Sequence, residues 1–281
     1  MRHIEHICRY IDFLKQVIGL KISIHPMKQN NVIDFGKLIK YNIHESVYCV
    51  YVKTSKAAHN KCLECQQKSV RKCENGDFTG VCHAGVYEYV YPLYASEEVI
   101  GFISVSGYKV QNPDIFFDTL HSKYGLSKER LINLYGELSD NIPNKSFIDS
   151  LIFPLCDMLE LSLSKSSINE AEPNILDRII FYLQNNHGQK ITLNDLCNEF
   201  YCSPSFLSHN FKKHTGKNIN EFLNELRIKD AKALLKKNGL SITEIALSVG
   251  FDDSNYFSEV FRKLTGMSPR EYRKTITERG K

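Results

Sequence analysis

The sequence reads Ser203-Pro-Ser-Phe-Leu-Ser-His-Asn-Phe-Lys-Lys-His-Thr-Gly216 in its last third, and fifty residues later it reads Asp253-Ser-Asn-Tyr-Phe-Ser-Glu-Val-Phe-Arg-Lys-Leu-Thr-Gly266. Five of the fourteen aligned positions are identical, and three more carry side chains of the same kind. A repeat at a fixed spacing indicates that one structural unit has been duplicated. We therefore expect two copies of one motif in this part of the chain.

Each copy has residues that favour the beginning and the end of a helix. Ser203 and Asp253 are favourable N-caps, and Pro204 suits the first helical position of the first copy. Gly216 and Gly266 suit the left-handed position that follows a last turn. Between these ends, apolar residues recur at helical spacing on one face and polar residues occupy the other. Each copy therefore predicts one amphipathic helix.

A shorter amphipathic helix and a tight turn are expected before each copy. Thr192–Asp195 is a near match to a capping box and Ser241–Glu244 is a full one, so both predict helix starts. Gly250 in the second turn permits backbone angles that other residues resist. Residues Phe222–Lys237 predict a connecting helix. The pattern indicates two helix-turn-helix units on one all-α body of seven helices, which begins near Asn174.

Two such units on one body fit double-stranded DNA. A helix fits the major groove, and two helices about 34 Å apart can enter successive turns on one side of the duplex. Polar residues expected to contact base edges are Ser205, Ser208, His209, Ser254, Asn255, Ser258 and Glu259. Basic residues expected to hold phosphates are Lys212, Lys213, Arg262 and Lys263. The alternative is an ordinary helical domain whose polar faces are only solvated.

Charge is distributed unevenly along the chain. The net charge of the 281 residues is +4, with 36 Lys and Arg against 32 Asp and Glu. Residues 174–281 hold 17 basic and 12 acidic residues, which gives +5, whereas residues 1–173 hold 19 and 20, which gives −1. A basic carboxyl-terminal part beside a neutral amino-terminal part favours a polyanion as the partner of the former.

The most specific stretch consists of Ile245-Ala246 and Gly250-Phe-Asp-Asp-Ser-Asn-Tyr-Phe-Ser-Glu-Val-Phe-Arg-Lys-Leu-Thr-Gly-Met-Ser-Pro-Arg-Glu-Tyr-Arg273. It resembles the AraC family of bacterial transcription regulators, and the resemblance extends from Asn174 to the end. It implies a tandem helix-turn-helix domain that binds promoter DNA and activates transcription through RNA polymerase. It also implies that the amino-terminal part senses, dimerises or does both. Glu259 departs from the pattern, since some relatives carry a basic residue there.

The amino-terminal part predicts a small antiparallel sheet with flanking helices. Residues Ile4–Ile18 have the spacing of an amphipathic helix. Residues Val47–Val52, Val86–Tyr91 and Val99–Val105 are rich in β-branched and aromatic residues and predict three strands, with Leu93–Glu98 closing a hairpin. Alternating tyrosines of these strands either line a pocket or pack in the core; they are Tyr48, Tyr51, Tyr87, Tyr89 and Tyr91.

Four of the nine cysteines fall in one window, together with a histidine. These residues are Cys62, Cys65, Cys73, Cys82 and His83. No export signal precedes them, so reduced thiols are expected, and a cluster of reduced thiols favours a small-ligand pocket or a metal site. Redox sensing and buried structural thiols are the alternatives. Catalysis by Cys82 with His83 is disfavoured, because neighbours on a strand point apart and no orienting third group is evident.

The same window carries a second resemblance. Cys62-Leu-Glu-Cys65, Cys73, Gly80-Val-Cys-His-Ala-Gly85, Tyr91-Pro92 and Gly101-Phe-Ile-Ser-Val-Ser-Gly107 together resemble the PocR sensory domain. The resemblance covers about residues 5–165. It implies a PAS-like sheet that senses a small hydrocarbon derivative, such as a diol, with the cysteines near the pocket. The cofactor, if any, stays open between an organic ligand and a metal.

Length and composition complete the expected organisation. At about 150 residues per domain, 281 residues favour two domains, here 1–165 for ligand sensing and 174–281 for DNA binding, joined by a linker at 166–173. Residues Phe147–Leu163 predict a helix with a broad apolar face that favours a homodimer. No apolar run reaches membrane-spanning length, so the protein is expected in the cytoplasm, without a membrane partner. The predicted function is ligand-controlled transcription regulation without enzyme activity.

Overall fold

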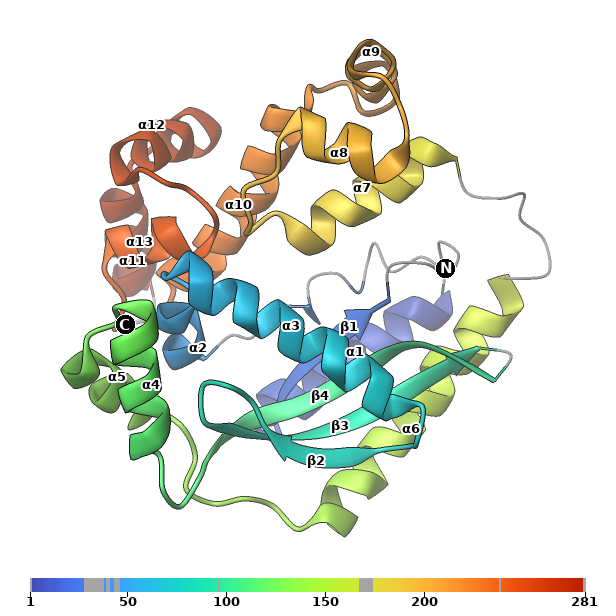
Figure 1. Cartoon of the computed structure of the whole chain (residues 1–281), viewed down its shortest axis with the longest axis vertical. Coiled ribbons are helices and arrows are strands. Elements are labelled where there is room, and N and C mark those ends of the chain that lie inside the picture. Colours follow the sequence, from blue (N-terminus) through green and yellow to red (C-terminus); the bar gives the residue numbers. More distant parts are fainter. Residues whose placement is uncertain are drawn as a thin grey trace. The chain divides into compact units, whose positions relative to one another are not determined.

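The computed structural model describes residues 2–27, 38, 41, 42, 46–95, 97–166, 174–237 and 239–279 (Figure 1). The chain divides into two compact units, the first made of Met1–Val52 with Ala57–Glu172 and the second of Lys53–Lys56 with Pro173–Lys281. The first unit combines helices with one sheet and the second is helical, so the expected α+β class is confirmed. Within the described ranges, no helix is long and apolar enough to cross a membrane. The expected linker, residues 166–173, lies outside the described residues except for Ser166.

Four antiparallel strands form the sheet of the first unit in the order β1-β4-β3-β2. They are β1 (Lys21–Pro26), β2 (Phe78–Val81), β3 (Val86–Ala95) and β4 (Glu98–Lys109). Strands β3 and β4 confirm two of the predicted strands and their hairpin, which is tighter than expected because pairing continues to Ala95 and Glu98. Strands β1 and β2 were not predicted, because six and four residues carry little periodic signal.

Six helices complete the first unit in the described part of the chain. They are α1 (Arg2–Gln16), α2 (Val47–Val52), α3 (Lys56–Cys73), α4 (Asp114–Tyr124), α5 (Lys128–Tyr135) and α6 (Lys145–Ser166). Helix α1 confirms the predicted amphipathic helix and buries Ile4, Ile7, Ile11 and Leu14. Ile18 is an exception to the prediction, because it follows the end of the helix and is 37% exposed.

The predicted strand at Val47–Val52 is wrong, since these residues form α2. Tyr48 to Val52 are all buried, so the segment is apolar on every face and its pattern does not distinguish a strand from a buried helix. The predicted strand position is wrong for Tyr48 and Tyr51, which lie on this helix, and is confirmed for Tyr87, Tyr89 and Tyr91, which lie on β3.

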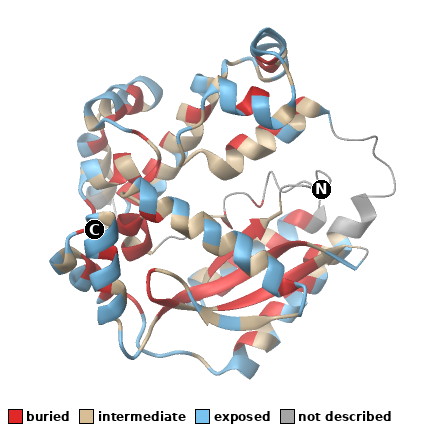
Figure 2. Cartoon of the chain, in the orientation of Figure 1, coloured by how far each residue is buried: buried red, intermediate tan, exposed pale blue. Residues whose placement is uncertain are grey.

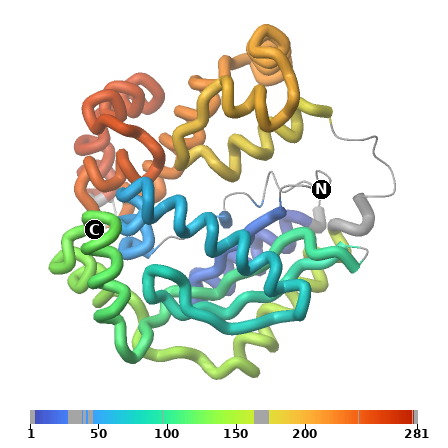
Figure 3. The backbone as a smooth tube through the Cα atoms, in the orientation of Figure 1, coloured from blue at the N-terminus to red at the C-terminus, as the bar shows by residue number. Residues whose placement is uncertain are grey.

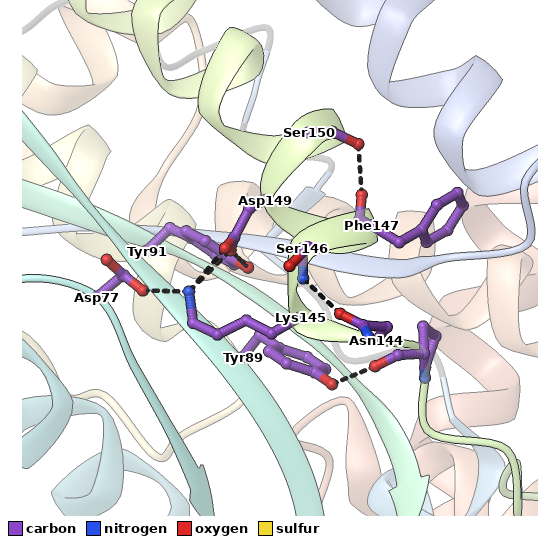
Figure 4. Close-up of polar contacts among 10 residues, drawn as sticks. Asp77, Tyr89, Tyr91, Asn144, Lys145, Ser146, Phe147, Asp149 and Ser150 are labelled. Carbon is purple, nitrogen blue, oxygen red and sulfur yellow. Dashed lines mark hydrogen bonds and ion pairs between the residues drawn. The ribbon is translucent and has the colours of Figure 1, made fainter.

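One face of the sheet is covered by α1 and α6. Helix α6 packs on β3 and against α1, and α1 packs on β1. Tyr89 and Tyr91 of β3 point to this side, where their hydroxyls donate to the Pro143 carbonyl and to Asp149 Oδ1 (Figure 4). Tyr89 and Tyr91 are therefore core residues with a polar tip that fastens the neighbouring layer.

Ion pairs fix the first turn of α6 on the edge of the sheet. Lys145 Nζ lies 2.8 Å from Asp77 Oδ2 and 2.9 Å from Asp149 Oδ1 (Figure 4). Burial alone would raise the pKa of Asp149, but hydrogen bonds from Lys145 and Tyr91 hold it below its ordinary value. Further along, α6 contains Pro154, which has no N–H for the helical hydrogen bond to the preceding turn. Helix α6 thus has a fixed beginning and a weakened middle.

In the described residues of the second unit, the structure has the seven helices expected from the sequence. They are α7 (Ile175–Asn186), α8 (Leu193–Phe200), α9 (Pro204–Thr215), α10 (Ile219–Leu235), α11 (Ile242–Ser248), α12 (Ser254–Thr265) and α13 (Pro269–Arg279). Helices α8 and α9 form one helix pair, and α11 and α12 form the other. Helix α10 runs between the two pairs and contacts α7, α9, α11, α12 and α13 (Figure 3). The first pair packs around Ile179, Leu183, Leu196, Leu207 and Phe211, which are all buried.

Candidate functional site

Helices α9 and α12 have the same length and the same ends. The Ser203 hydroxyl accepts from Phe206 N, and Asp253 Oδ1 accepts from Asn255 N and Tyr256 N, which confirms both predicted N-caps. Gly216 and Gly266 follow the last turns with φ of 75° and 82°. The predicted capping boxes of α8 and α11 are also present. Local sequence therefore fixes where each of these helices begins and ends.

The duplication extends beyond the two quoted stretches. In each copy a threonine that precedes the glycine donates to a carbonyl four residues earlier, at Phe211 and at Phe261. The following helix then begins with a capping box, formed by Asn218 with Glu221 before α10 and by Ser268 with Glu271 before α13. The sequence contains this signal at matching positions, so the repeat includes α10 and α13 as well.

Most of the predicted DNA contacts lie on the exposed side of these helices (Figure 2). The exposed residues are Ser205, Ser208, His209, Lys212, Lys213, Asn255, Glu259, Arg262 and Lys263. The other faces hold the buried Leu207, Phe211, Phe257 and Phe261. The polar faces of α9 and α12 therefore take no part in the packing that holds the two helices in place.

Ser254 and Ser258 differ from the other nine residues because they are half-buried. The Ser258 hydroxyl donates to the Ser254 carbonyl at 2.8 Å, so its proton already has an acceptor within the helix. Two exposed aromatic residues share these faces and were missing from the prediction. They are Phe206 and Tyr256, 43% and 51% exposed, and they occupy matching positions of the repeat.

A half-buried arginine of α10, Arg227, fastens the second helix-turn-helix to the body. Arg227 Nε donates to the His187 carbonyl and Arg227 Nη2 to the Gln189 carbonyl, both at 2.8 Å. Its guanidinium also lies 5.5 Å from the centre of the Phe251 ring. Gly250, at φ 101°, is so close to the same segment that a Cβ would lie 2.8 Å from the His187 carbonyl oxygen. The role of Arg227 has no local sequence signal, because its partners lie far away in the chain.

A hollow of about 460 Å³ lies beside α9. Its lining comes from the beginning of α8, from the beginning of α10 and from one residue of α9; these residues are Ile191, Thr192, Leu193, Ser208, Asn218, Ile219 and Asn220. Two helix N-termini therefore border one hollow next to an exposed polar face. The capping boxes already place the carboxylates of Asp195 and Glu221 at these two N-termini.

In the first unit, the structure separates the predicted cysteine cluster into two places. Cys62 and Cys65 lie in the middle of α3, whereas Cys73 is its last residue. At 1.5 Å per residue, Cys73 lies about 16 Å along the helix from Cys62. Cys73 packs with Val90 and Phe102, and burial raises its pKa to about 12. Among the described residues, no group of three or more potential ligands is arranged to hold a metal ion.

Cys62 and His83 do come together. Cys62 Sγ lies 3.1 Å from His83 Nε2, and burial, with a contribution from Lys61, lowers the pKa of His83 to about 4. Cys82 and His83 lie in the turn between β2 and β3, so their placement on a strand was wrong. Burial raises the pKa of Cys82 well above its usual value, which keeps the thiol protonated and weakly nucleophilic.

Two tyrosines hold this turn against the helices. The hydroxyl of Tyr48 donates to the Ala84 carbonyl and that of Tyr135 to the Gly85 carbonyl, both at 2.7 Å. Gly85 has φ 76°, and a Cβ there would lie 2.8 Å from the Phe116 ring. The turn that contains Cys82 and His83 is therefore fixed by buried hydrogen bonds and by close packing.

Comparison with known proteins assigns both units. A family model described as the sensory domain found in PocR matches residues 3–150, more than half of the chain, and one described as a helix-turn-helix domain matches residues 196–275. The chain belongs to the AraC-type regulators with a PocR sensory domain. The first unit of this regulator is therefore its sensory unit, and the second is its DNA-binding unit.

Several relatives are similar to the regulator over part of its length. The uncharacterized HTH-type transcriptional regulator YijO of Escherichia coli is 37% identical over 127 residues, 45% of this chain and 44% of that protein. The HTH-type transcriptional activator RhaR of Shigella dysenteriae is 33% identical over 155 residues, 53% of this chain and 55% of that protein. The chain thus spans about half the length of these curated relatives.

Solved structures are similar to part of the chain. The C-terminal domain of AraT, a response regulator from Geobacillus stearothermophilus, is 36% identical, with 37% of this chain and 86% of that chain covered and a TM-score of 0.35. A DNA-binding transcriptional dual regulator from Escherichia coli is 31% identical, with 39% and 98% covered and a TM-score of 0.35.

Proposed function

We propose that the regulator activates transcription by inserting α9 and α12 into successive major grooves of promoter DNA under the control of a small effector. The observation that carries this proposal is the pair of matched helices, with exposed polar faces, on one body around α10. Two reading helices on one chain can recognise a site that otherwise needs two subunits.

The two faces carry different chemistry for reading bases. Asn255 can form a bidentate pair with adenine and Glu259 can accept from cytosine, so α12 has the more selective side chains. Helix α9 presents Ser205, Ser208 and His209, which form single hydrogen bonds with more than one base. We infer that α12 supplies more of the sequence discrimination than α9.

Phosphate contacts are proposed for the basic residues of the two helices. Lys212, Lys213, Arg262 and Lys263 are exposed near the ends of the two helices, where a cation meets the backbone of the duplex. These contacts position the protein and carry no sequence information.

Effector control, activation and dimerisation belong to the same proposal. Effector binding to the sensory unit is proposed to change the DNA affinity or the contact with RNA polymerase by favouring one arrangement of the chain. Dimerisation through α6 is supported by three of its apolar side chains, Phe147, Phe153 and Leu161, which are 49%, 45% and 61% exposed. Analytical ultracentrifugation of the full chain and of Phe153→Ser tests the dimer.

DNase footprinting on DNA upstream of the gene tests the DNA proposal. We expect one protected site with two contact regions about 10 base pairs apart on the same side of the duplex. Insertion of five base pairs between the two regions should abolish tight binding, because it turns the second groove away, and insertion of ten should also weaken it strongly, because two helices on one body cannot reach regions two helical turns apart. Equal affinity for all three spacings would contradict simultaneous insertion of both helices.

A further inference from the structure

The sheet of the sensory unit has a polar row on the face opposite to α1 and α6. In the β1–β4 ladder Ser23 pairs with Ser104 and His25 with Phe102, and in the β3–β4 ladder Glu88 pairs with Ser106. Paired residues of an antiparallel ladder point to the same side. The resulting row consists of Ser23, His25, Glu88, Ser104 and Ser106, which we call the polar row.

Burial makes this row unusual. Ser23, His25, Ser104 and Ser106 are 2%, 5%, 0% and 8% exposed. The alternate residues of the same strands, such as Ile22, Ile24 and Ile103, are apolar and face α1 and α6. A buried polar group costs free energy unless it is hydrogen-bonded, so buried polar side chains gathered on one face indicate a use other than packing.

The groups of the polar row form hydrogen bonds with one another. Ser23 Oγ and His25 Nε2 are 3.0 Å apart, and Ser104 Oγ donates to Glu88 Oε2 at 2.8 Å. Glu88 is half-buried as a residue, and desolvation raises the pKa of its carboxyl group against the smaller lowering effects of the Ser104 hydrogen bond and the Lys72 charge. A carboxyl group in such surroundings gains when a ligand donates hydrogen bonds to it.

Space and neighbouring groups complete the site. Gly80 of β2 pairs with Glu88, so no side chain stands beside the carboxyl on that strand. A Cβ on Gly80 would have the Phe78 ring, at 3.8 Å, as its nearest neighbour. The negative charge of Glu88 contributes to the raised pKa of Cys82, so the two side chains lie close together. Cys73 and Lys72, at the end of α3, lie over the same face of the sheet. Part of the cysteine cluster therefore borders the polar row.

We propose that the polar row is the effector site of the sensory unit and that it takes a small molecule whose hydroxyl or ammonium groups donate hydrogen bonds to Glu88. This inference rests on the proposed effector control. Serine hydroxyls and the imidazole of His25 both donate and accept, so they complement a ligand that carries several polar groups on a short carbon skeleton.

Isothermal titration calorimetry on the full chain tests the site with two sets of probes. Glycerol, erythritol and ribitol are the polyol set, and ethanolamine, propylamine and putrescine are the amine set. The variants are Glu88→Gln, which keeps the shape of the side chain and removes its charge, and Gly80→Leu, which fills the space beside it. Glu74→Gln, an exposed carboxyl after α3, and Thr79→Leu, on the other face of β2, are the matched controls.

We expect at least one probe to bind the wild type and to bind both Glu88→Gln and Gly80→Leu about tenfold more weakly. For Glu88→Gln this is the value of one charge-assisted hydrogen bond, and for Gly80→Leu the cause is the loss of space for the probe. The two controls should bind within about twofold of the wild type, and circular dichroism should confirm that all four variants are folded. The set that contains the tighter probe identifies hydroxyl or ammonium as the donor. A probe that binds all variants equally, or no binding from either set, would overturn the proposal.

Reporter transcription separates this site from the wider proposal. If a bound probe changes neither DNA affinity nor transcription, effector control fails while the site stands. If a probe changes transcription through wild type and Glu88→Gln alike, control stands while the polar row is the wrong site.

Discussion

The two helix-turn-helix units are copies in sequence, yet their turns are held in different ways. The first turn begins at Tyr201, which directly follows α8, has φ 51° and is 96% exposed. In the second turn Gly250 touches the backbone of His187 and Gly188, and Phe251 is 2% exposed beneath the Arg227 guanidinium. The two copies therefore share their helices, whereas only the second turn packs against the rest of the unit.

The turn glycine should give the largest difference between the two units. Gly250→Ala places a Cβ 2.8 Å from a backbone oxygen at a strained φ, so we expect a loss of about 3 to 5 kcal/mol in the free energy of unfolding. Tyr201→Gly relaxes a left-handed backbone at an exposed position and should change stability by about 1 kcal/mol or less. Urea unfolding measures both, and equal losses would refute the contrast.

Arg227 should give the next largest effect. Arg227→Met keeps much of the buried stem but leaves the His187 and Gln189 carbonyls without their donor, for a loss of about 2 to 4 kcal/mol. Lys229→Met, an exposed position on the same helix, is the control and should be close to neutral. A footprint should lose protection first over the region read by α12. Uniform loss over both regions would show that Arg227 does not act on the second unit specifically.

The matched pair Ser205 and Asn255 tests the difference in base reading. Asn255→Ala should cost about 1 to 3 kcal/mol on the target sequence and little on random DNA, because a bidentate contact to a base is removed. Ser205→Ala removes at most one hydrogen bond and should cost about 0.5 to 1 kcal/mol. Fluorescence anisotropy with both DNAs measures these values. If Asn255→Ala weakens target and random DNA alike, the base contact is wrong.

The matched pair Lys213 and Lys263 should show the smallest difference between the units. Both are exposed at the same position of the repeat, and a phosphate contact is independent of sequence. Each substitution by alanine should weaken binding to all DNA and reduce the slope of log affinity against log salt by about 1. A change confined to the target sequence would instead indicate a base contact.

The sequence predicted the DNA-binding unit well because its signals are local. Caps such as Ser203 and Gly216 act within one turn of the helix, so they could be read without knowing the fold. Arg227 and Gly250 show the limit: a glycine was expected in the turn, but its contact with His187 depends on a segment more than sixty residues away.

The sensory unit was harder to predict for physical reasons. Residues Val47–Val52 are apolar on every side, so their periodicity carried no information about helix or strand. The polar row is assembled from one or two residues on each of three strands. One of these strands, β1, supplies Ser23 and His25 and was not predicted. The cysteines stood out by their type, yet Cys73 proved to be a packing residue about three helical turns from Cys62.

Helix α6 is held at its first turn and can bend further along, at Pro154. Its first turn is clamped by Asp77 and Asp149 through Lys145, and Pro154 removes one hydrogen bond on the way to Ser166. At 1.5 Å per residue the 12 residues that follow Pro154, up to Ser166, extend about 18 Å, so a bend of about 5° at Pro154 displaces the far end by about 1.6 Å. A small change of angle at Pro154 therefore becomes a displacement of more than one ångström at Ser166.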